Sequence, residues 1–212
     1  MKFPMSYTAM LLGLIAIDST AFAQGAEQSK FVGPAMGLTV SATQTKVDYE
    51  SSLSSINGQS SQGNDSEAAL VASYGFPLTT DWVGTVGLSY GLKSADAGSI
   101  NYTYGGTQTV TVKVKEHLSL SFAPGYRLDS NVLVYGKLAY HQMKGEYNDT
   151  ASSGGTSNHS GNGFGFGFAF APAPSIELRA EYESITYSSE KILLTTGKPK
   201  QSAVSLAVLY KF

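Results

Sequence analysis

Ionisable side chains fall at alternate positions in several segments of this sequence, and that spacing limits the chemistry they can do. The residues are Glu67, Lys93, Lys113, Lys115, His117, Lys137, His141, Glu177, Arg179, Glu181 and Glu183. Side chains two residues apart lie on the same face of a β-strand, and a buried charge is stable only when it is paired and hydrogen-bonded. If the strands enclose a common interior, bases on some strands and acids on another therefore predict an ion-pair network there.

Two other uses of the same residues remain open. Charged side chains along a lumen could line a thin ion or water pathway, with the network acting as its gate. His117 and Ser119, together with a carboxylate, supply the residue types of a hydrolytic triad, although alternation places both in the lumen. No group of Cys or His has the spacing of a zinc site, and the acids of the loops make no calcium-binding pattern. We therefore expect no metal and no other cofactor.

Eight segments alternate apolar with small or polar residues, which predicts β-strands. They cover about Val32–Tyr49, Glu67–Phe76, Trp82–Lys93, Thr109–Phe122, Val132–Lys144, Gly163–Phe170, Ile176–Glu183 and Ala203–Phe212. The connections at 77–81, 127–131 and 171–175 are tight, whereas those around 50–66, 94–108, 147–162 and 188–200 are long and polar. In an antiparallel meander, every short turn then lies at one end, which is typical of outer-membrane barrels. We predict an all-β fold, an eight-stranded antiparallel up-and-down transmembrane barrel.

The composition indicates which face of the strands is outside. Only 14% of the residues are charged, well under the share usual for soluble domains. The bulky face would therefore contact lipid, and the small face would line a lumen with room only for side chains. The row Gly163, Gly165 and Gly167 would leave space there for larger side chains of neighbouring strands. Candidates for that space are Tyr135, Lys137, His141 and Arg179.

Aromatic residues gather near both ends of the predicted strands, as two interfacial belts would require. Toward the short turns lie Tyr74, Phe76, Trp82, Phe122, Tyr126, Tyr210 and Phe212, and toward the long loops lie Tyr49, Tyr90, Tyr140 and Tyr147. Strands favour Tyr and Phe in any case, but that preference alone would not mark both ends. We therefore predict that these residues lie at the two membrane–water boundaries.

The first 23 residues have the parts of a secretory signal peptide. Lys2 precedes an apolar run from Met10 to Ile17, and Ala21-Phe22-Ala23 precedes Gln24. Cleavage would leave residues 24–212 as a single barrel domain without cysteine, and without the roughly 20 consecutive apolar residues that a transmembrane helix needs. The formal net charge of −2 gives no reason to expect a nucleic-acid partner.

The signal peptide, the first strand FVGPAMGLTVS, the eight alternating runs and the terminal LAVLYKF together resemble a known family. They are similar to the small outer-membrane β-barrel proteins of Gram-negative bacteria, the opacity-protein and OmpA/OmpX-like superfamily. The resemblance covers the whole mature chain. It implies a non-enzymatic protein of the cell outer membrane that displays four extracellular loops.

The resemblance also implies partners. The barrel assembly machinery would read the C-terminal strand at Tyr210 and Phe212, periplasmic chaperones would hold the exported chain, and outer membrane lipids and lipopolysaccharide would surround the barrel. The loops could bind a host or phage surface ligand. Two alternatives remain, a narrow porin-like channel for ions or small solutes and, less favoured, a lipid A-modifying barrel enzyme. Such an enzyme needs a site that faces lipid, whereas His117 and Ser119 are predicted to face the lumen.

Overall fold

The computed structural model describes residues 29–51, 57–103, 107–149, 155–192 and 195–212, so the predicted signal peptide lies outside the described residues. Ten antiparallel β-strands make up most of this part of the chain. They are β1 (Gly33–Ser51), β2 (Ser60–Pro77), β3 (Trp82–Gly91), β4 (Ala95–Thr103), β5 (Thr107–Arg127), β6 (Val132–Asp149), β7 (Gly155–Ala173), β8 (Ile176–Tyr187), β9 (Glu190–Ile192) and β10 (Thr195–Lys211). Within the described ranges, no helix is long and apolar enough to cross a bilayer.

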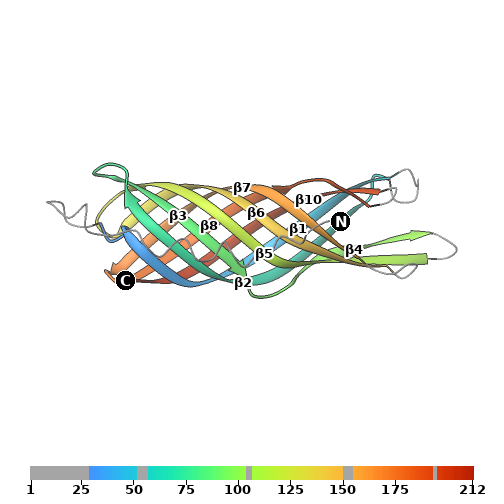
Figure 1. Cartoon of the computed structure of the whole chain (residues 1–212), viewed down its shortest axis with the longest axis horizontal. Coiled ribbons are helices and arrows are strands. Elements are labelled where there is room, and N and C mark those ends of the chain that lie inside the picture. Colours follow the sequence, from blue (N-terminus) through green and yellow to red (C-terminus); the bar gives the residue numbers. More distant parts are fainter. Residues whose placement is uncertain (1–28, 52–56, 104–106, 150–154, 193–194) are drawn as a thin grey trace, which may run out of the picture.

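Eight of the strands form a closed ring (Figure 1). Each pairs with its neighbours in the order β1, β2, β3, β5, β6, β7, β8, β10. The ring closes because β10 pairs with β1, from Ala35 opposite Lys211 to Ser51 opposite Thr195. Closure leaves no edge in the ring, which is the condition for a sheet to cross hydrocarbon. The predicted eight-stranded up-and-down barrel is confirmed.

The strands continue past their predicted ends on the long-loop side (Figure 1). β1 has 19 residues and β5 has 21, about twice the 9–11 that cross a bilayer. β2, β7 and β10 begin inside segments predicted as loops, and β4 and β9 pair beside the ring with β5 and β10. The polar sequence of these extensions does not prevent strand formation, because strand preference depends on context and a neighbouring strand supplies the backbone hydrogen-bond partners. The long loops are therefore shorter than predicted.

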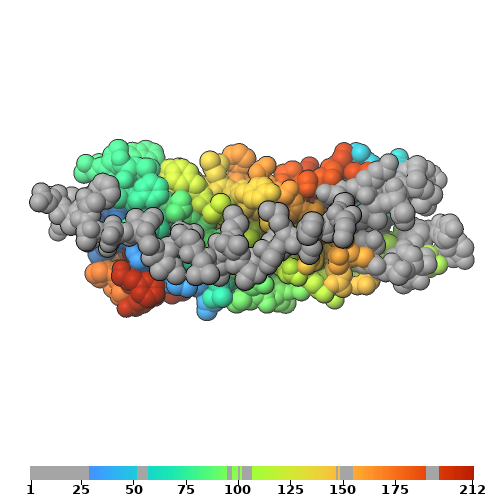
Figure 2. Space-filling model, in the orientation of Figure 1, coloured from blue at the N-terminus to red at the C-terminus, as the bar shows by residue number. Residues whose placement is uncertain are grey.

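A band of exposed apolar side chains surrounds the ring, whose outer surface is drawn in Figure 2. It includes Met36, Leu38, Val40, Leu70, Trp82, Tyr90, Leu118, Leu120, Phe122, Tyr126, Val134, Leu138, Tyr140, Phe164, Phe166, Phe168, Phe170, Ile176, Leu178, Tyr182, Val204, Leu206, Val208 and Tyr210. Phe164 and Phe166 are 67% and 66% exposed, and an apolar patch of this extent marks a surface made for an apolar environment. The bulky face therefore lies outside, as predicted.

Candidate functional site

The centre of the lumen holds carboxylates from β8 and bases from β6. Lys137 Nζ lies 2.8 Å from Glu181 Oε2 and 3.0 Å from Glu183 Oε2. The Tyr135 hydroxyl donates to Glu181 at 2.6 Å, and His141 Nε2 lies 2.8 Å from Glu183 Oε1. The side chain of Lys137 is 15% exposed and that of Glu183 is 10% exposed. Each of these charges is therefore paired where water is scarce.

Two histidines extend these contacts across the lumen to β2 and β10. His117 Nε2 lies 2.9 Å from His141 Nδ1, and His117 Nδ1 lies 3.4 Å from Glu67 Oε2. The Gln201 amide donates to Glu67 at 3.0 Å, and the Tyr187 hydroxyl donates to Gln201 at 3.1 Å. An unbroken series of polar contacts thus connects strands on opposite sides of the ring.

The roles of the histidine nitrogens as donors or acceptors depend on where the protons of the two rings lie. Glu183 accepts from His141 Nε2, so the other nitrogen of a neutral His141 accepts from His117 Nε2. His117 then donates to Glu67 only when its own ring is protonated. One extra proton on the pair satisfies all three contacts, and moving it to the other ring reverses the central bond without changing the count.

A second ion group lies nearer the short turns. Arg179 Nε donates to Glu177 Oε1 at 2.6 Å, and its Nη2 donates to Ser73 Oγ at 3.1 Å. Lys211 Nζ lies 3.5 Å from Glu177 Oε2, and the side chains of Lys211 and Glu177 are 6% and 3% exposed. The two groups together contain four carboxylates and three bases besides the histidines. The members are Glu67, Glu177, Glu181 and Glu183, with Lys137, Arg179 and Lys211.

Inward-facing glycines on β7 make room for the network. A Cβ added at Gly163 would meet the side chains of Glu183 and His141. A Cβ added at Gly167 would meet the Tyr135 ring. The prediction that the glycine row leaves space for side chains of neighbouring strands is confirmed at these two positions.

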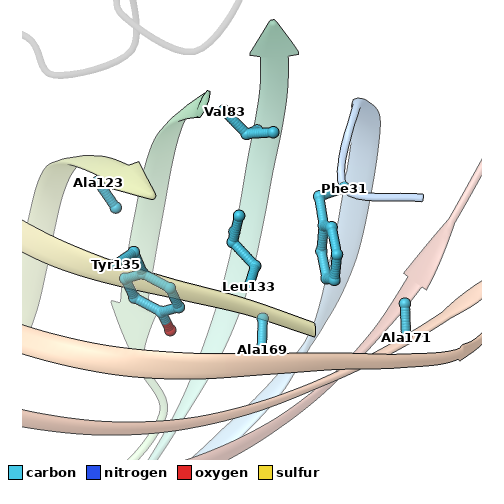
Figure 3. Close-up of a cluster of buried hydrophobic side chains, with 7 residues drawn as sticks. All are labelled: Phe31, Val83, Ala123, Leu133, Tyr135, Ala169 and Ala171. Atoms are coloured by element: carbon cyan, nitrogen blue, oxygen red, sulfur yellow. The ribbon is translucent and has the colours of Figure 1, made fainter. Parts of the chain in front are cut away.

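Apolar clusters bound the network toward both ends of the lumen. The cluster at the short-turn end, drawn in Figure 3, contains Phe31, Val83, Ala123, Leu133, Tyr135, Ala169 and Ala171. The cluster at the loop end contains Ala97, Val114, Met143, Ile185 and Tyr187, with Val112 packed against it. The cavity between them has a volume of about 100 Å³, which holds only a few water molecules. The polar layer of Lys137, Glu181 and Glu183 thus lies between apolar side chains in the described part of the barrel, whereas Glu177 and Lys211, at the short-turn ends of β8 and β10, lie beside the short-turn cluster.

Sequence reasoning did not identify these clusters or three further members of the network, Tyr187, Gln201 and Lys211. The signal was present in the alternation. Val83 and Leu133 are large apolar residues on the face otherwise occupied by small ones, at the start of their strands. Lys211 shares its face with Ala203 and Ala207. Large or charged residues on a small face predict side chains that fill the lumen.

A β-bulge in β5 reverses the faces of that strand. The pairing of β5 with β6 shifts register between Lys115 and Leu118, and Glu116 has a positive φ of 48°. A bulge inserts one residue and re-aims the side chains beyond it. Below the bulge, Leu118 faces outward, whereas above it Val114 is 4% exposed and packs inside.

The bulge makes the predicted lumen positions of Lys113 and Lys115 wrong. Lys113 is exposed, and Lys115 pairs with Glu146 on the outer surface. Lys93 is misplaced for another reason, because it lies beyond the end of β3 and pairs at the surface with Asp65 at 3.0 Å. The other predicted charged residues, including His117, do face the lumen.

Most of the predicted interfacial aromatics lie on the outer face. Trp82, Tyr90, Phe122, Tyr126, Tyr140, Tyr210 and Phe212 are exposed there, and Tyr74 and Phe76 are half-buried. The rings of Trp82 and Tyr126 pack edge to face at 5.5 Å between centroids. The prediction for Tyr49 is wrong. Odd-numbered side chains in this part of β1 face the lumen, so Tyr49 lies there, 9% exposed, with its hydroxyl hydrogen-bonded to Ser61. The side chain of Tyr147 lies outside the described residues.

The geometry does not assemble the hydrolytic triad that His117 and Ser119 allowed. The two ring nitrogens of His117 lie beside Glu67 and His141, so neither is left to take a proton from Ser119. Ser119 is buried in the lumen wall at 6% exposure.

Comparison with known proteins gives a family and a set of similar folds. The family model described as outer membrane protein beta-barrel domain matches residues 9–212. No curated protein matches this sequence. Among solved structures, Ail of Yersinia pestis in complex with a heparin analogue is 17% identical, covers 85% of this chain and 100% of its own, and has a TM-score of 0.49.

Two other solved structures show similar coverage. Neisserial surface protein A is 16% identical over 82% of this chain and 97% of its own, with a TM-score of 0.46. The outer membrane protease OmpT of Escherichia coli is 7% identical over 84% of this chain and 96% of its own, with a TM-score of 0.49.

Proposed function

The chain belongs to the outer membrane protein β-barrel family, and on that premise we propose that it is a non-enzymatic anchor of the Gram-negative outer membrane. The barrel would hold four loops at the cell surface, where variable, solvent-facing segments can bind a host or phage ligand. The observation that supports this role is the content of the lumen, where an ion-pair network lies between two apolar clusters. Side chains that fill a barrel in this way stabilise it and oppose the passage of solutes.

The same proposal covers export and assembly. The signal peptide would be cleaved after Ala23, and periplasmic chaperones would carry residues 24–212 to the barrel assembly machinery. Tyr210 and Phe212 are exposed on the outer face at the end of β10, 57% and 76% respectively, where an assembly factor could contact them. N-terminal sequencing of the membrane-embedded protein should begin at Gln24.

The proposal is tested by the behaviour of the purified barrel and of intact cells. A folded barrel should change mobility on gels when it is boiled, and protease added to intact cells should cut only in the loops. In planar bilayers the protein should give no conductance steps. Recovery of the protein in a detergent-free osmotic extract would contradict the membrane location.

A narrow channel is the second candidate, because a polar layer crosses the middle of the lumen. The clusters around Phe31 and Val114 narrow the lumen on either side of that layer. Conductance that disappears with Glu181→Gln or Lys137→Ala would favour this candidate over the anchor. Altered lipid A in cells that overproduce the protein would instead favour an enzyme.

A further inference from the structure

The four residues before β1 fold inward over the short-turn end of the lumen. Pairing between β1 and β2 begins at Gly33, opposite Gly75, so residues 29–32 precede the ring. They contain a turn and a bend, and Gly33 has a φ of 101°, a left-handed backbone that favours glycine. This path brings Phe31 into the short-turn cluster, where the residue is 3% exposed (Figure 3).

The Phe31 ring packs into a cluster that other strands build. Its members include Val83 of β3, Ala123 of β5, Leu133 of β6 and Ala171 of β7. In the ring order, β6 lies opposite β1. A side chain that enters beside β1 thus reaches side chains of the far wall, and it covers the lumen at this end.

Two further features position the segment at this end of the lumen. Lys30 Nζ donates to Asn131 Oδ1 at 2.5 Å, in the turn between β5 and β6 on the far side of the ring. A Cβ at Gly75 would lie 1.9 Å from the carbonyl oxygen of Phe31, so the segment approaches β2 closely only because a glycine is there. The wall of the barrel is therefore shaped to receive residues 29–32.

The second ion group lies beside this segment. Glu177 and Lys211 belong to the short-turn ends of β8 and β10, yet their side chains are only 3% and 6% exposed. Charged groups at an open end of a barrel would be hydrated, and burial is stable for them only when they are paired. The access of water to Glu177 and Lys211 therefore depends on whether this end of the lumen is closed.

We propose that residues 29–32 are a reversible lid on the short-turn end of the lumen. In the closed state, the Phe31 ring keeps water from the second ion group. In the open state, water fills the lumen up to the polar layer. The lid can leave without breaking the ladders of the ring, because its backbone hydrogen bond is internal, from Val32 N to the Ser29 carbonyl oxygen at 2.9 Å.

The lid goes beyond the anchor role, because it gives the lumen two states of hydration. Segments with few buried contacts open locally, at a free energy well below that of global unfolding. One ring and one side-chain hydrogen bond hold this segment in the contacts described above. The cluster at the loop end takes no part, so an open lid hydrates the lower lumen without opening a passage through the barrel.

The test measures how fast a reagent reaches a position that is buried with Phe31. The sequence has no cysteine, so Ala171→Cys in residues 24–212, folded in detergent, gives one thiol at a site that is 0% exposed. A small cationic thiol reagent should modify this cysteine slowly. Adding Phe31→Ala should raise the rate at least about tenfold, because burial of a phenylalanine side chain is worth that factor or more. Phe31→Leu, which keeps much of the apolar surface, should raise the rate by less.

A second cysteine position separates opening of the lid from general loosening of the barrel. Ala97 is 1% exposed in the cluster at the loop end. The reaction of Ala97→Cys should therefore be equally slow with and without Phe31→Ala. A mobility shift on boiling identifies the variants that are folded.

Three results would overturn the proposal. An unchanged rate at position 171 after Phe31→Ala would show that the ring does not control access. Faster reaction at both cysteine positions would assign the effect to a loosened barrel. Reaction at position 171 beside an intact Phe31 as fast as that of Leu128→Cys, which is on an exposed turn, would show that this end is already open. The anchor role is tested by location and surface cleavage, so its failure is distinguishable from failure of the lid.

Discussion

The two halves of β5 place different kinds of side chain in the lumen. One half contributes to a polar interior and the other to an apolar interior. Below Glu116, the strand turns Leu118 and Leu120 outward and contributes His117 to a polar interior. Above Glu116, it turns lysines outward and contributes Val114 to an apolar interior. The membrane-level segment thus has an apolar outside and a polar inside, and the segment beyond it has the arrangement of a water-soluble protein.

This contrast shows that the surrounding medium, and not the strand, decides which side chains face out. In lipid, apolar residues are stable outside and charges must be paired inside. In water, the favourable arrangement is reversed. One extra residue at the bulge makes the change within a single continuous strand. Removing a lysine should therefore lower the free energy of unfolding strongly when that lysine lies inside the barrel below the bulge. It should lower it only slightly when the lysine lies on the outer surface above the bulge.

The largest expected effect tests the interior charges at membrane level. Lys137→Ala leaves Glu181 and Glu183 without their shared base, and breaking a buried ion pair costs about 3–5 kcal/mol of unfolding free energy. Urea unfolding in lipid vesicles measures this loss. The matched variant Lys115→Ala, on the outer surface above the bulge, should change it by less than about 1 kcal/mol. Similar losses in both variants would contradict the contrast between the two segments.

The next effect tests how tightly the polar layer is packed. Gly163→Ala brings a methyl group against Glu183 and His141, and overpacking of this kind costs about 1–3 kcal/mol. Gly136→Ala is the control, because a Cβ there meets nothing within 4 Å. Unfolding in the same vesicles should distinguish the two. A stable Gly163→Ala barrel would show that the network can move aside.

The reversal of faces at the bulge can be seen directly by labelling. The sequence has no cysteine, so single cysteines at positions 114 and 115 report on one side chain each. Lys115→Cys should react with a membrane-impermeant thiol reagent on intact cells, and Val114→Cys should react far more slowly. Both variants should still shift in mobility on boiling. Faster reaction at position 114 would place the bulge elsewhere.

The smallest effect concerns the outer surface above the membrane. The hydrogen bond from Lys115 lowers the pKa of the Glu146 carboxyl. The pair therefore favours the folded state above the ordinary Glu pKa, and this contribution is lost as pH falls through the lowered value. A carboxyl titration by NMR should show the midpoint of Glu146 rise in Lys115→Gln. High salt should shrink the difference, and an unchanged midpoint in the variant would contradict the pairing.

Much of the architecture follows from the sequence because the alternation of apolar with small or polar residues reflects which medium each face of a strand contacts. It predicted the ring, the outward Phe164 and Phe166, and the inward placement of Lys137 and Glu181. The bulge at Glu116 could not be found this way, since no residue around it demands a left-handed backbone, and it becomes visible only as a register shift in the pairing with β6. The polar extensions of β2, β7 and β10 were missed because their neighbours, and not their own residues, stabilise them.

Closure of the ring by its first and last strands has a consequence for synthesis. Ala35 meets Lys211, so the final ladder joins residues from nearly opposite ends of the chain, and contacts so distant in sequence form slowly. A polypeptide interrupted before β10 would expose the free edges of β1 and β8 together. Such edges are templates for aggregation, so truncated products should require rapid degradation in the periplasm.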